Sequence, residues 1–154
     1  MADERQPIWV LDSSSSIAIR TLIPRDKREA LYNRLTELVK AGRLKFPREV
    51  VGELRKYAGP ENPALAWANA QSDVAARDQP TLAEVREVLG QVPEVLDPDK
   101  EGEEEGDPYI LAMARRLEGD IRIVTEDVKS TGSKMSLAGA AGYLGNPKRT
   151  SARS

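Results

Sequence analysis

The sequence predicts an α/β fold in which a short parallel sheet is flanked by helices. Two apolar runs, residues 8–11 and 121–125, have the length and the β-branched composition of buried strands, and residues 43–46 form a weaker third run. The helical segments that separate these runs are too long for hairpins. Strands connected through helices run parallel, with the helices packed on the faces of the sheet.

The first part of the chain continues from the strand at residues 8–11 into two expected helices. The serine run Ser13–Ser16 follows this strand, and we expect it to begin a short helix that ends before Pro24. Residues 26–41 place their apolar side chains on one helical face, and Gly42 is a typical stop.

The middle of the chain shows the signals of three further segments of helix and one loop. Pro47 suits the first turn of a helix that reaches Gly59, and apolar periodicity predicts helices over residues 63–77 and 80–89. Residues 94–106 are acidic and rich in glycine and proline, which predicts a loop.

The last part of the chain begins with a clear helix start. Asp107 suits the N-cap and Pro108 the first helical position of a helix that leads into the last strand. Residues 136–144 favour one more short helix, and residues 146–154 are typical of a basic, disordered tail. Residues 1–145 are therefore expected to form a single domain.

The composition restricts the chemistry that this chain can perform. Its 154 residues include no histidine and no cysteine. Thiolate nucleophiles, cysteine-based zinc sites and histidine-dependent catalytic triads are therefore excluded. Any catalysis must use carboxylates, hydroxyls, lysine, arginine or a bound hard metal ion.

The N-terminal residues and the hydropathy pattern indicate the cellular compartment in which the protein is expected. Residues 1–7 are polar and charged, unlike a signal peptide, and no apolar stretch approaches the 18 or so residues that a membrane span needs. We expect a cytoplasmic protein without a membrane partner.

Four acidic residues lie either just after an expected strand or on an expected helix. Asp12 follows the first strand, Asp127 follows the last, Asp107 begins a helix, and Glu53 precedes a buried leucine. Ligands of parallel α/β sheets bind at the carboxyl ends of the strands, so these acids are expected to converge there. Taken singly, Asp12 is equally well explained as a helix cap, and Asp107 is better explained as one. Glu53 alone is more typical of a solvated helix residue and Asp127 of a loop acid, so that only the joint placement favours a site.

A convergence of four carboxylates has a chemical consequence. Ionised carboxylates repel one another unless a cation offsets their charge, and an oxygen-only ligand set selects Mg²⁺ or Mn²⁺. Ions held in this way can orient a phosphodiester and activate water for its hydrolysis. Such chemistry needs neither histidine nor cysteine, in agreement with the composition. Glu49, one helical turn from Glu53, and Glu126, beside Asp127, remain alternative ligands.

Four stretches in this order resemble the motifs of PIN-domain nucleases. They are Val10-Leu11-Asp12-Ser13-Ser14, the run from Phe46 to Leu54, the run from Asp107 to Ala114, and Ile123-Val124-Thr125-Glu126-Asp127. The resemblance implies a Rossmann-like three-layer sandwich and a Mg²⁺- or Mn²⁺-dependent ribonuclease. It also implies that Asp12, Glu53, Asp107 and Asp127 are the catalytic, metal-binding acids and that the Ser14 hydroxyl supports them.

Among PIN proteins the chain is most similar to VapC-like toxins of type II toxin–antitoxin modules. This resemblance implies an RNA substrate, a cognate antitoxin protein and a possible homodimer. The helices between residues 59 and 90 and the acidic loop are longer than in compact toxins, and residues 132–134 lack a strong final strand.

The alternative function is a non-catalytic PIN-like module that binds RNA or protein. A phosphatase that uses Asp12 is disfavoured, because Ser14 stands where a second aspartate would be needed.

The net charge of −2 is unevenly distributed. Residues 94–107 hold eight acids and one lysine, a charge of −7, which leaves +5 for the rest of the chain. A mildly basic body suits the RNA backbone, and the acidic loop suits a guard over the pocket or a site for a basic partner.

Overall fold

The computed structural model describes residues 6–59, 61–93, 107–125 and 148–149. Its sheet is entirely parallel and has the strand order β2-β1-β3-β4. The central strand is β1 (Ile8–Leu11), between β2 (Leu44–Lys45) and β3 (Ile121–Val124), and β4 (Lys148–Arg149) pairs with β3. The predicted α/β class with a short parallel sheet is confirmed.

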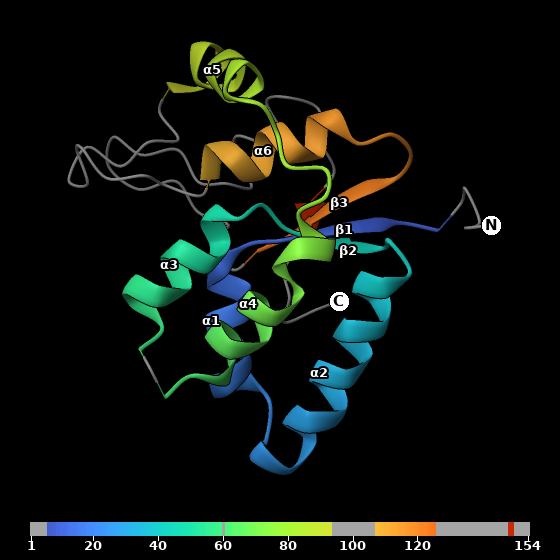
Figure 1. The fold of residues 1–154 in the computed structure, drawn as a ribbon, viewed down its shortest axis with the longest axis vertical. Coiled ribbons are helices and arrows are strands. Elements are labelled where there is room, and N and C mark those ends of the chain that lie inside the picture. The colour runs from blue at the N-terminus through green and yellow to red at the C-terminus, as the bar shows by residue number, and fades with distance from the viewer. Residues whose placement is uncertain (1–5, 60, 94–106, 126–147, 150–154) are drawn as a thin grey trace.

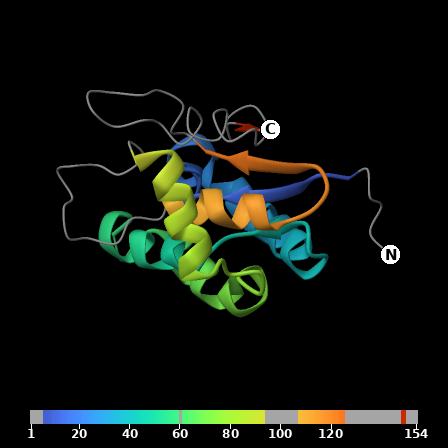
Figure 2. The ribbon, with the colours of Figure 1, turned by 90° about the horizontal axis from the view of Figure 1, so that it is seen from above.

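Helices cover both faces of this sheet. Figure 1 shows α5 and α6 on one side and α1, α2 and α4 on the other, so that the fold is a Rossmann-like three-layer sandwich; Figure 2 shows the same layers from above. The helices of the described residues are α1 (Ser13–Leu22), α2 (Arg25–Lys40), α3 (Glu49–Tyr57), α4 (Pro63–Ala75), α5 (Leu82–Gln91) and α6 (Asp107–Arg116).

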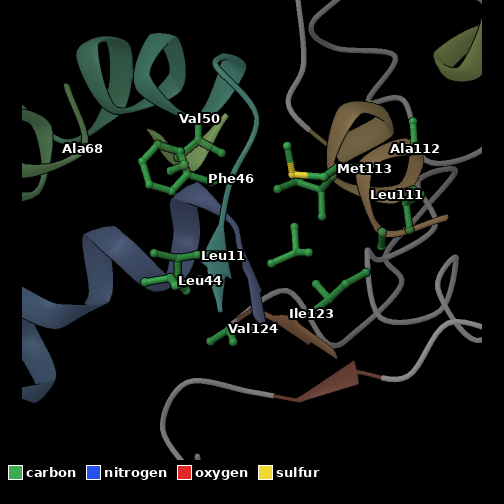
Figure 3. Close-up of a cluster of buried hydrophobic side chains, with 14 of the residues drawn as sticks. Leu11, Leu44, Phe46, Val50, Ala68, Leu111, Ala112, Met113, Ile123 and Val124 are labelled. Carbon is green, nitrogen blue, oxygen red and sulfur yellow. The ribbon is translucent and has the colours of Figure 1, made fainter. Parts of the chain in front are cut away.

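The strands of the sheet bury alternate side chains on its two faces. Leu11 pairs with Val124, and both line the face under α1 and α2 together with Leu44. Val10 pairs with Ile123, and both are fully buried on the opposite face, on which α6 places Met113 (Figure 3). The two-residue period of a strand thus gives β1 a hydrophobic contact on each side.

The face under α1 and α2 is not completely filled. A pocket of about 580 Å³ lies between these helices and the sheet. Its lining is apolar apart from Ser15, and it includes Trp9, Leu35 and Leu38. A pocket without a charged lining side chain does not suit a phosphodiester, so the candidate functional site lies elsewhere.

Local capping explains where several helices begin and end. Asn62 caps α4 by accepting the Ala64 N–H at 2.9 Å, and Pro63 takes the first helical position. Thr81 and Glu84 form a reciprocal capping box, so that α5 begins at Leu82 rather than at residue 80. Gly42 follows α2 with a φ of 75°, a left-handed conformation that favours glycine.

Some sequence-based boundaries need correction. Pro47 lies before α3 instead of in its first turn, because its carbonyl accepts the Val50 N–H at 3.1 Å in a tighter turn that precedes the helix. Lys148 and Arg149, expected in a disordered tail, instead form β4 beside β3. The expected loop over residues 94–106 and helix over residues 136–144 lie outside the described residues.

Among the helices of the described residues, none has both the length and the apolar composition that spanning a bilayer requires.

Candidate active site at the start of α1

The Asp12 carboxylate lies at the junction of β1 and α1 and is the most enclosed of the candidate acids that the structure describes. Asp12 is only 3% exposed, and it is the N-cap of α1. Its Oδ1 accepts the Ser15 backbone N–H at 2.9 Å, its Oδ2 accepts the Thr125 hydroxyl, and the Ser14 Oγ lies 2.9 Å from both oxygens. Strand pairing brings these groups together, since the Asp12 N–H bonds to the Val124 carbonyl at 3.2 Å.

Burial dominates the ionisation of this carboxyl group. Removal from water disfavours the charged form and raises the pKa of Asp12 to about 6, although the bonds from Thr125, Ser15 and Ser14 act in the opposite direction. A positive charge placed beside Asp12 would lower this pKa again and favour the carboxylate.

The remaining hydrogen-bonding capacity of Asp12 is consistent with a metal ligand. A carboxylate has about four lone-pair positions. The Ser15 N–H and the Thr125 hydroxyl each fill one, and the Ser14 hydroxyl, with a single proton, fills one at a time. The Ser15 hydroxyl also acts on this carboxylate, so a cation would compete with it for the fourth position. Oxygen ligands of this kind suit Mg²⁺ or Mn²⁺.

Each serine of the run Ser13–Ser16 has a different role. Ser14 bonds the Asp12 carboxylate through its hydroxyl, and Ser15 does so through its backbone N–H. The Ser16 hydroxyl donates to the Asp12 carbonyl at 3.1 Å. The Ser13 hydroxyl points to another element and donates to Glu53 Oε1 on α3, at 3.0 Å. A run that looks like a flexible linker is thus the start of a helix and the support of two acids.

The two glutamates of α3 lie in different surroundings. Glu53 is bonded to Ser13, the residue next to Asp12. Glu49 accepts a hydrogen bond at 2.8 Å from the side chain of Gln79, whose own oxygen accepts the Arg48 N–H at 2.9 Å. Glu49 therefore ties α3 to the turn between α4 and α5, and Glu53 is the glutamate that faces the start of α1.

The other candidate acids are less closely associated with Asp12. Asp107, expected at the N-cap of α6, is instead the first residue of this helix, and Pro108 is the second. Helix α6 leads through residues 117–120 into the first residue of β3. The start of α6 therefore lies toward the carboxyl edge of the sheet, as Asp12 does. Within the described part of the chain, however, no three acids are close enough together to hold a metal ion, so Asp107 does not form one group with Asp12 and Glu53. Asp127 and Glu126 lie outside the described residues.

Two residues of the site were missed by the sequence analysis. Thr125 is fully buried and donates to Asp12, and Ser13 donates to Glu53. Strand register could have identified Thr125: if β1 and β3 end together, the residue after Val124 faces the residue after Leu11. No comparable signal exists for Ser13, because its contact depends on how α3 packs against α1.

Comparison with known proteins gives one result that covers most of the chain. Residues 9–141 match the family described as a domain of unknown function (DUF4411). The chain belongs to this family. The matched region of the DUF4411 domain includes Asp12, Glu53, Asp107 and Asp127, all four candidate acids. Searches of the curated proteins and of the solved structures found no match.

Proposed function

We propose that the protein is a metal-dependent endoribonuclease of the PIN type that acts as the toxin of a toxin–antitoxin pair. One observation is the main support: Asp12 and Glu53, which are 41 positions apart in sequence, are held at the same helix start through adjacent residues. That arrangement lies at the carboxyl edge of a parallel sheet, where ligands of such folds bind.

The proposed ligands are Asp12 and Glu53. The resemblance to PIN-domain nucleases adds Asp107, which the described residues do not bring into one group with these two, and Asp127, which lies outside the described residues. Ser14, Ser15 and Thr125 orient the Asp12 carboxylate toward the ion. A Mg²⁺ or Mn²⁺ ion bound there would supply an activated water and stabilise the charge that develops on the phosphate. Because the chain has no histidine, proton transfer depends on carboxylates and water.

The proposed partners follow from charge and from the resemblance to VapC-like toxins. Outside residues 94–107 the chain carries a charge of +5, which favours contact with the RNA backbone and predicts salt-sensitive binding. A cognate antitoxin would bind the toxin in the cytoplasm and keep it inactive, and a homodimer is part of the same proposal.

The two glutamates of α3 provide a matched test of this function. We expect purified protein to cleave single-stranded RNA in Mg²⁺ or Mn²⁺ and to lose this activity in EDTA. Glu53→Gln should lower the cleavage rate by roughly 100-fold, because it removes a proposed ligand charge. Glu49→Gln, the same chemical change one turn away, should stay within about threefold of the wild-type rate, since Glu49 bonds Gln79 instead.

The measurement is the initial rate of cleavage of a labelled RNA at saturating metal, with thermal unfolding of each variant as a control for folding. Equal rates for wild type and Glu53→Gln would contradict the proposed site. RNA binding without cleavage by the wild-type protein, in either metal, would instead favour a non-catalytic binding module.

A further inference from the structure

We propose that Ser13 is a positioning residue for Glu53 in the metal site. This inference rests on the proposed function, and it assigns a task to a residue that does not itself touch the metal ion. The Ser13 Oγ donates to Glu53 Oε1 at 3.0 Å, and the two residues belong to different helices.

The hydroxyl of Ser13 is not needed to begin α1. Asp12 already caps this helix by accepting the Ser15 N–H, and the Ser16 hydroxyl bonds the Asp12 carbonyl. Ser14 and Ser16 therefore act on Asp12, whereas Ser13 contacts the neighbouring helix. A serine at the first position of α1 that bonds an acid on α3 links the two acids of the proposed site.

The hydrogen bond from Ser13 restricts the conformation of the Glu53 side chain. A glutamate side chain has three rotatable bonds, and fixing them costs conformational entropy. Glu53 is half-buried and bonds Ser13, the residue next to Asp12. A hydrogen bond to Oε1 holds the side chain at the start of α1, where the helix dipole also favours a negative charge. It leaves Oε2 for a metal ion.

The test compares Mn²⁺ binding by the wild-type protein, Ser13→Ala, Ser13→Thr and Glu53→Gln. Calorimetric titration of the metal-free proteins with Mn²⁺ gives the dissociation constants. Ser13→Ala should weaken Mn²⁺ binding roughly tenfold, as is usual when a residue that orients a ligand is removed. Ser13→Thr keeps the hydroxyl and should stay within about threefold of the wild type.

A double variant shows whether Ser13 acts through Glu53. In the Glu53→Gln background, Ser13→Ala should weaken Mn²⁺ binding by less than about twofold, because the carboxylate on which it acts is gone. Tenfold weakening in both backgrounds would overturn the inference, since Ser13 would then act independently of Glu53.

The outcomes also separate this inference from the proposed function. If the wild-type protein binds Mn²⁺ and cleaves RNA while Ser13→Ala binds Mn²⁺ equally well, only the positioning role fails. If the wild-type protein neither binds Mn²⁺ nor cleaves RNA, the proposed function fails and the role of Ser13 fails with it.

Discussion

Replacing Asp12 by asparagine is expected to abolish RNA cleavage and to stabilise the protein at neutral pH. Activity should fall roughly 1,000-fold or more, because a buried charged ligand of the proposed site is lost. The fold should persist, since asparagine is as good an N-cap as aspartate and the hydroxyls of Ser14 and Thr125 can accept as well as donate hydrogen bonds.

The gain in stability follows from the burial of Asp12. The pKa of Asp12 is about 6 in the folded protein, compared with 3.8 for an aspartate exposed to water. At neutral pH the folded state therefore holds a charge that burial disfavours. The difference in pKa corresponds to about 3 kcal/mol at most. Asparagine removes the charge, and we expect the free energy of unfolding to rise by about 1–3 kcal/mol.

Two measurements on the same preparation test this prediction. Cleavage of labelled RNA in Mn²⁺ reports activity, and urea unfolding at pH 7.5 in EDTA reports stability. A variant that is less active and less stable would show that Asp12 is a structural cap. A variant that cleaves RNA at the wild-type rate would contradict its place among the metal ligands.

The stability of the metal-free protein is expected to fall as the pH rises from about 4 to about 6. In this interval the folded state binds a proton at Asp12 that the unfolded state has already released, because burial raises the pKa of Asp12 from 3.8 to about 6. Stability decreases with pH wherever the folded state binds more protons. The full loss is about 3 kcal/mol, and above about pH 7 Asp12 contributes no further change.

The control for the pH dependence is Asp12→Asn, which lacks the titrating group. Other acids titrate in the same interval; for example, the bonds from Thr81 hold the pKa of Glu84 below its usual value, which acts in the opposite direction. The free energies of unfolding of wild type and variant are measured by urea unfolding from pH 4 to pH 7.5 in EDTA. Their difference at each pH gives the contribution of Asp12 to stability. A flat difference curve would show that Asp12 titrates normally in the folded protein.

The architecture was predictable from local patterns. The strands at Ile8–Leu11 and Ile121–Val124 are continuous apolar runs, as expected of strands buried on both faces. Residues typical of helix caps precede three of the described helices, namely Asp12 before α1, Asn62 before α4 and Thr81 before α5. The pairing of Lys148 and Arg149 was not predictable, because two basic residues show no hydrophobic pattern and their pairing depends on a neighbouring strand.

The candidate site was predictable in its residue types but not in its contacts. The position of Asp12 after a strand is visible in the sequence, and the structure places it at the carboxyl edge as expected. Glu49 and Glu53 are one turn apart on the same helix, so sequence spacing could not separate them. Their different partners, Gln79 and Ser13, come from elements distant in the chain.

The bond between Asp12 and Thr125 joins residues 113 positions apart. Parallel strands cannot pair through a tight turn, so β1 acquires its partner β3 only after every helix between them has been made. During synthesis, Asp12 emerges from the ribosome well before Thr125, and it lacks this hydroxyl until 113 further residues have been translated. The complete support of this acid therefore forms only after β3 has been made, which delays the assembly of the site.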